Sequence, residues 1–134
     1  MLLSLQENQK EIVDTVFEKL YTPMRLKSLS KDNSKYSGKY YGTIFERDSV
    51  YHQGTVWTKP IGAFIDAHYL IYQDKSVLEM QLKGLKDHFY NEEVIGSIVE
   101  IYDGDTLHEC CGCFAQAWSV VEILRVIEKY QLIV

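Results

Sequence analysis

Four apolar stripes at helical spacing, separated by two long stretches that have none, constrain this chain most. The stripes lie within residues 5–20, 58–72, 77–90 and 115–130. In each of them apolar residues recur every three or four positions, which places them on one face of a helix. The last stripe is apolar almost all round, so that helix is expected to be buried on several sides. The sequence therefore predicts an all-α fold of four helices.

Residues 21–56 and 91–114 connect these helices and are rich in Gly, Ser, Asp and Lys. Loops longer than about 15 residues without regular structure are uncommon in compact domains, and they are usually functional or disordered. We expect ordered loops, because the first segment and the residue after it hold a dense set of aromatic residues: Tyr36, Tyr40, Tyr41, Phe45, Tyr51 and Trp57. Residues 1–134 are thus predicted to form a single domain whose site lies on its loops.

Charge and cysteine content exclude several classes of protein. The net charge is -5, whereas nucleic-acid binding needs a basic face; the basic stretch over residues 25–39 is interpreted as a solvated loop. No apolar run approaches the roughly 20 residues that span a bilayer. Three crowded cysteines, Cys110, Cys111 and Cys113, suit a reducing compartment better than a disulfide framework. We expect a cytoplasmic protein without nucleic-acid or membrane partners.

The same cysteines, together with His108, raise the question of a zinc site. Structural zinc sites draw paired ligands from two separated clusters, whereas here all the candidates fall within six residues, 108–113. Ordinary reduced thiols in a packed loop are the better interpretation. We expect no metal and no cofactor.

Residues 51–57 combine the groups that a polyhydroxylated ligand needs. Tyr51, His52, Gln53 and Trp57 offer planar donors and acceptors for hydroxyl groups and an aromatic face for a sugar ring. An ordered loop that caps the following helix would explain the same residues equally well.

Two further segments hold candidate site residues. Glu100 lies among apolar neighbours and is followed by Asp103 and Asp105; inverting glycosidases use two carboxyl groups, one as acid and one as base. The alternative is a glycine turn whose acids bind backbone N–H groups. Gln116 and Trp118 are flanked by small residues that allow a ligand to approach, although Trp118 could equally pack in the core.

Several blocks resemble the C-terminal amylo-α-1,6-glucosidase domain of glycogen debranching enzymes, in the same order and at similar spacing. Residues 51–57 read Tyr-His-Gln-Gly-Thr-Val-Trp, and residues 100–105 read Glu-Ile-Tyr-Asp-Gly-Asp. Residues 112–120 resemble the family's Gly-Cys-x-Ala-Gln-Ala-Trp-Ser-Val block, and residues 20–30 carry its Thr-Pro and Ser-Leu-Ser elements. Together these blocks cover nearly the whole chain.

The resemblance implies an (α/α)6 toroid that removes the α-1,6-linked glucose at glycogen branch points with inversion. It implies that Glu100 is the general base that activates water. It also implies an α-glucan or glucose oligosaccharide as the partner. The positions that match the family's sugar pocket are Tyr51, His52, Gln53, Trp57, Gln116, Trp118 and Lys27.

Two departures limit what the resemblance implies. The family often has Arg where this chain has Lys27, and Lys cannot copy a planar guanidinium fork. The family's general acid lies in an upstream Trp-Met-Asp segment that this sequence lacks. The alternative to a base-carrying enzyme part is therefore a non-catalytic remnant or glucan-binding domain, and we expect the isolated chain to be inactive.

Length agrees with a partial domain. Twelve helices of about 11–12 residues would need roughly 135 residues without any loops. We therefore expect the closing third of the toroid, beginning at Met1. Apolar faces that the rest of the barrel would cover drive association when they are exposed. This predicts a homo-oligomer or a complex with the upstream part of the same barrel.

Overall fold

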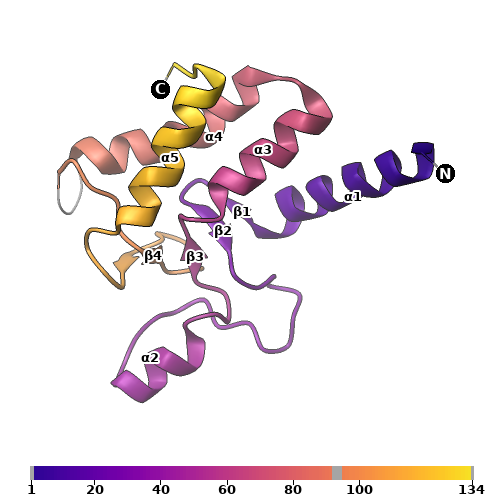
Figure 1. Cartoon of the computed structure of the whole chain (residues 1–134). Coiled ribbons are helices and arrows are strands. Elements are labelled where there is room, and N and C mark those ends of the chain that lie inside the picture. Colours follow the sequence, from indigo (N-terminus) through magenta and orange to yellow (C-terminus); the bar gives the residue numbers. More distant parts are fainter. Residues whose placement is uncertain (1, 92–94, 134) are drawn as a thin grey trace.

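A computed structural model describes residues 2–91 and 95–133 (Figure 1). The helices are α1 (Leu2–Leu20), α2 (Ile44–Val50), α3 (Ile61–Tyr72), α4 (Lys75–Asn91) and α5 (Ala117–Tyr130). The strands are β1 (Tyr21–Thr22), β2 (Arg25–Lys27), β3 (Val56–Trp57), β4 (Ile101–Tyr102) and β5 (Cys110–Cys111). The strands form one antiparallel sheet in the order β1-β2-β3-β4-β5.

The predicted all-α fold of four helices is wrong: the described residues form five helices and a five-stranded sheet, a mixed α/β arrangement. Each strand is only two or three residues long. Alternation of apolar and polar residues becomes recognisable over about four to eight residues, so strands this short leave no periodic signal. Strand pairing joins the first long segment, residues 21–56, and the described part of the second, residues 95–114.

The helix that the sequence analysis missed is α2. None of its residues is buried, so it has no apolar stripe for a periodicity argument to detect. It begins at a capping box, in which the Thr43 N–H donates to Glu46 Oε2 at 2.7 Å and the Glu46 N–H donates to Thr43 Oγ1 at 3.4 Å. In Figure 1, α2 lies apart from the other helices, on the far side of the small sheet.

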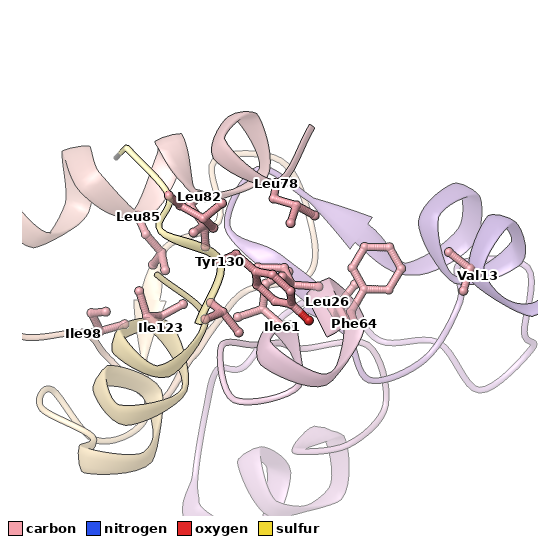
Figure 2. Close-up of a cluster of buried hydrophobic side chains, with 13 residues drawn as sticks. Val13, Leu26, Ile61, Phe64, Leu78, Leu82, Leu85, Ile98, Ile123 and Tyr130 are labelled. Atoms are coloured by element: carbon pink, nitrogen blue, oxygen red, sulfur yellow. The ribbon is translucent and has the colours of Figure 1, made fainter. Parts of the chain in front are cut away.

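The main core lies among α1, α3, α4 and α5 (Figure 2). Helix α3 packs against α5, α1 and α4. The side chains at the centre of this core, which are fully buried, are Ile61, Ile65, Leu78, Leu82 and Val126. These residues come from the helical stripes of the sequence, so the main core is where the periodicity placed it.

Helix α5 is not buried on several sides, contrary to expectation. Ile123 and Val126 face the core, but Val121 is 58% exposed and Leu124 is 59% exposed. A second apolar face therefore remains open to solvent. Over the described residues, no helix combines the length and the apolar character that crossing a bilayer requires.

Candidate functional site

The sheet brings the two long segments of the chain together. Strand β3 pairs with β4, and the register sets Trp57 opposite Ile101 and Val56 opposite Tyr102. Glu100 directly precedes β4, so strand pairing places it beside the segment that ends at Trp57. Neither segment alone contains a complete site; pairing between residues more than 40 positions apart assembles it.

Glu100 is held by hydrogen bonds at both carboxylate oxygens. The Tyr51 hydroxyl donates to Glu100 Oε1 at 2.6 Å, and the Cys113 N–H donates to Glu100 Oε2 at 3.1 Å. The Glu100 N–H in turn donates to the Cys113 carbonyl at 2.9 Å. Burial and the neighbouring Glu100 carboxylate raise the pKa of Tyr51 well above its ordinary value. Tyr51 therefore stays protonated at neutral pH and acts as a donor that orients Glu100.

Tyr51, which contacts this carboxylate, belongs to a group of neighbouring aromatic side chains that we call the aromatic cluster: Tyr51, His52, Trp57 and Trp118. The Tyr51 ring centroid lies 4.8 Å from the ring centroids of both His52 and Trp57. His52 stacks on Trp57 at 4.9 Å, and the Trp118 ring lies 6.5 Å from that of Trp57. Trp118 is 39% exposed, so it does not pack in the core, which was the alternative interpretation of this residue. Glu100 and the aromatic cluster therefore share one side of the molecule.

Three of the predicted site residues make different contacts. The Gln53 carbonyl accepts the Ser37 N–H at 2.6 Å, and the Gln116 N–H donates to the Ile98 carbonyl at 2.9 Å, so these two residues contribute backbone bonds that shape the segments. Lys27 lies near Lys31 and Asp105; burial, then the like charge of Lys31, lowers the pKa of Lys27. Their roles toward a sugar stay predictions.

Two residues that the sequence analysis did not select extend the aromatic cluster. The Tyr40 ring lies 5.7 Å from the Tyr51 ring, and Lys59 Nζ lies 4.5 Å from the ring centroid of Trp118. The aromatic density of residues 36–57 could have suggested Tyr40. No local pattern could have suggested Lys59, because its contact depends on how α5 packs beside β3.

Asp103 has the structural role that the alternative interpretation gave it. Its buried carboxylate accepts the Tyr40 N–H at 2.8 Å and forms a salt bridge with Lys39 Nζ, also at 2.8 Å. The Cys111 thiol lies 3.6 Å from Asp103 Oδ1, and burial raises its pKa to about 12, so it stays protonated. Asp103 therefore fastens the segment that carries Tyr40 to the turn after β4.

Backbone contacts tighten the same junction. The Gly104 N–H donates to the Gly38 carbonyl at 2.9 Å. A Cβ atom at Gly104 would lie 2.0 Å from the Gly54 carbonyl oxygen, so only glycine allows this close approach. Beside it, the Tyr36 hydroxyl donates to Asp105 Oδ1 at 3.1 Å. The conformation of the site thus depends on contacts between the two segments at several points.

Cys110, Cys111 and Cys113 are not joined in a disulfide: Cys110 and Cys111 are half-buried and Cys113 is exposed. In the part of the chain that the structure describes, no three His, Cys, Asp or Glu side chains are grouped to hold a metal ion.

A carboxylate held by a tyrosine of an aromatic cluster is suited to a carbohydrate-processing protein, because sugar rings present apolar C–H faces and polar rims. The amylo-alpha-1,6-glucosidase family model matches residues 2–125. The chain belongs to this glycoside hydrolase family and is thereby related to glycogen debranching enzymes. A search of curated protein sequences returns no match.

Proposed function

We propose that this chain carries the water-activating side of an inverting α-1,6-glucosidase pocket, with Glu100 as the general base. The observation that carries the proposal is the 2.6 Å hydrogen bond from Tyr51 to Glu100 within the aromatic cluster. A general base needs a fixed orientation toward the water that it activates. Tyr51 and the Cys113 N–H supply that orientation to the two oxygens of Glu100.

The aromatic cluster is the proposed glucose pocket. Trp57 and Trp118 offer ring surface to the C–H faces of glucose, and His52 offers a ring nitrogen to its hydroxyl groups. Because His52 already stacks on one face of Trp57, we place the sugar on the opposite face of that ring. The substrate is a neutral α-glucan, which an acidic chain of net charge -5 does not repel.

Binding of glucan without hydrolysis is the second candidate. Inverting hydrolysis needs a general acid roughly 6.5–9.5 Å from the base. Over residues 2–91 and 95–133, the carboxylate that is hydrogen-bonded to the aromatic cluster is Glu100. The general acid must therefore be a different carboxyl group, one that is not hydrogen-bonded to the aromatic cluster. Without that acid, the site binds α-glucan and releases no glucose.

Glucose release from a branched limit dextrin separates the two candidates. Catalysis predicts that Glu100→Gln lowers the release about 100-fold or more, because the amide cannot accept a proton from water. Glu109→Gln is the matched control: it changes an exposed glutamate of the same segment and leaves the rate unchanged. Binding of maltooligosaccharide by a wild-type chain that releases no glucose supports the second candidate. Absence of both release and binding contradicts both.

We also propose that the chain forms a homo-oligomer, most simply a twofold dimer. A groove of about 270 Å³ lies between α4 and α5 and is lined mainly by apolar residues, among them Leu85, Phe89 and Ile123. Leu124 also lines this groove, and the exposed Val121 of the same helix enlarges the apolar surface that a second copy could cover. Light scattering is expected to give twice the chain mass, and a stable monomer contradicts this proposal. Three cysteines that form no disulfide support a cytoplasmic location.

A further inference from the structure

A single buried hydroxyl group connects two residues of the aromatic cluster. Thr55 directly precedes β3 and is wholly buried. Its Oγ1 atom lies 2.6 Å from the Tyr51 carbonyl oxygen and 2.9 Å from Trp57 Nε1. Trp57 Nε1 also lies 3.3 Å from the Tyr51 carbonyl oxygen, so the three groups form a closed ring of hydrogen bonds. Thr55 therefore contacts both the tyrosine that orients Glu100 and the tryptophan of the proposed glucose pocket.

The direction of each bond follows from the chemistry of the partners. A carbonyl oxygen only accepts and an indole N–H only donates, so the Thr55 hydroxyl donates to Tyr51 and accepts from Trp57. In its 3.3 Å contact with Ser28 Oγ, the donor is Ser28, because the single hydroxyl proton of Thr55 is already used. Ser28 Oγ in turn accepts the Gly54 N–H at 3.0 Å. The Thr55 hydroxyl thus uses its one donor and both of its acceptor sites.

These bonds hold the plane of the Trp57 ring. Turning the indole would separate Nε1 from Thr55 and from the Tyr51 carbonyl, and would leave a buried hydroxyl without one of its partners, which is unfavourable. His52 stacks on one face of the ring at 4.9 Å, so the opposite face is kept in one orientation. Because the indole N–H is already bonded within the protein, Trp57 offers a sugar its ring face.

The same hydroxyl anchors the backbone of Tyr51, whose side chain donates to Glu100 Oε1 at 2.6 Å. Tyr51 follows helix α2, and none of the residues of α2 is buried, so packing of that helix cannot hold Tyr51 in place. Thr55 is itself fixed beside β2, because the Ser28 N–H donates to the Thr55 carbonyl at 2.8 Å. A continuous path of hydrogen bonds therefore runs from Ser28 through Thr55 and Tyr51 to Glu100.

We propose that Thr55 is a positioning residue of the glucan site, which sets the ring of Trp57 and, through Tyr51, the carboxylate of Glu100. This role rests on the proposed function, because it takes Trp57 as the surface that binds glucose and Glu100 as the base. Since Thr55 is wholly buried, it touches no ligand and acts only through these neighbours.

Two substitutions in the whole chain separate the hydroxyl of Thr55 from its shape. Thr55→Val removes the hydroxyl and keeps the branched side chain, whereas Thr55→Ser keeps the hydroxyl. Thr58→Val is the matched control, because Thr58 is also wholly buried and its hydroxyl donates to the Val99 carbonyl at 3.5 Å, outside the aromatic cluster. Circular dichroism verifies folding. If Thr55→Val does not fold, Ser28→Ala takes its place, since it removes one of the three bonds of this hydroxyl, with smaller effects in the same direction.

Hydrogen exchange at the indole N–H groups of the two tryptophans, followed by NMR, reports on the ring directly. In Thr55→Val the Trp57 indole N–H should exchange about 3- to 10-fold faster, the factor that one lost hydrogen bond represents, while Trp118 keeps its rate. Maltopentaose binding, measured by calorimetry, should weaken about 3- to 10-fold as well. Thr55→Ser should restore both values, and Thr58→Val should change neither.

Unchanged exchange at Trp57 or unchanged maltopentaose affinity in Thr55→Val overturns the inference, and the proposed function stands if Trp57→Ala still weakens binding. An equal loss of affinity in Thr58→Val also overturns it, because the effect is then a general loss of stability. The same holds if Thr55→Ser behaves like Thr55→Val, since the hydroxyl is then not the cause. A wild-type chain that neither binds maltopentaose nor releases glucose overturns the proposed function, and the inference with it.

Discussion

Among the residues that the structure describes, the helical body, formed by α1, α3, α4 and α5, supplies most of an apolar cluster of thirteen buried residues, whereas the second cluster, in the loop–sheet region, has three. We define the loop–sheet region as residues 21–60 and 98–116. Its buried residues include many polar ones: Thr22, Arg25, Thr55, Thr58 and Asp103. Apolar burial is non-directional, whereas hydrogen bonds need specific geometry. The body can therefore tolerate adjustment, while the site region depends on particular bonds.

The comparison also explains where the site lies. A carboxylate that activates water must keep its orientation, and hydrogen bonds from Tyr51 and the Cys113 N–H fix Glu100 in a way that apolar packing could not. The apolar body supplies the stability, and the polar junction supplies the geometry. Changes in the two regions should accordingly differ in size and in how far their effects spread.

The largest effect is expected in the helical body. Leu82 is fully buried in the main core, so Leu82→Ala should lower the free energy of unfolding by about 2–5 kcal/mol, through lost burial and the cavity that remains. Denaturant unfolding measures the change. Leu70→Ala, at a residue of α3 that is 67% exposed, is the control and should stay within about 0.5 kcal/mol. Similar losses for both variants would contradict the assignment of the core.

A smaller and local effect is expected at the junction. Asp103→Ala leaves the Tyr40 N–H and Lys39 without their acceptor, which should cost about 1–3 kcal/mol. Hydrogen exchange should speed up at the Tyr40 amide while amides in α4 keep their protection. Glu109→Ala should change neither. If protection in α4 falls as much as at Tyr40, the two regions unfold together and the distinction between them fails.

The smallest effect concerns a polar contact within the helical body. Asp66 of α3 accepts hydrogen bonds from Lys129 Nζ at 2.8 Å and the Tyr130 hydroxyl at 2.6 Å, and pairs with Arg125 at 3.0 Å. Burial alone would raise the pKa of Asp66, but these partners bring it below the ordinary value of 3.8. The folded-state pKa is thus below the unfolded one, so the contact stabilises the protein above pH 3.8 and is lost as pH falls through the folded-state pKa.

Asp66→Asn should therefore cost about 1 kcal/mol at pH 7 and make stability less dependent on pH below pH 4. Thermal unfolding between pH 2 and pH 7 measures both effects. Asp32→Asn, which removes an exposed salt bridge with Lys19, is the control and should have a smaller effect. An unchanged pH profile in Asp66→Asn would show that α3 and α5 do not depend on this contact.

How much the sequence could predict differs between the same two regions. The stripes that contain Ile61, Leu78, Leu82 and Val126 gave the main core correctly, because helical period is a local property. The five strands were not predicted, because two or three residues are too few to show a period and because their pairing is non-local. Helix α2 was not predicted because none of its residues is buried, although the spacing of Thr43 and Glu46 is that of a capping box.

The candidate site shows the same division. Residues 51–57 and Glu100 were selected by residue type and family resemblance, yet no local pattern indicated that Tyr51 donates to Glu100. The salt bridge of Asp103 with Lys39 joins residues 64 positions apart, and no local pattern encodes it. Residue types thus suggested the kind of ligand, and the fold was needed to show which side chain orients which.

The two tryptophans of the chain, Trp57 and Trp118, both belong to the aromatic cluster, so tryptophan fluorescence reports on the proposed pocket alone. Titration of the whole protein with maltopentaose is the most direct test of the claim that Glu100 and the aromatic cluster form a glucan site. We predict a saturable change in emission that Trp118→Phe reduces. Unchanged emission at concentrations where calorimetry detects maltopentaose binding would contradict the claim, because the sugar would then bind elsewhere.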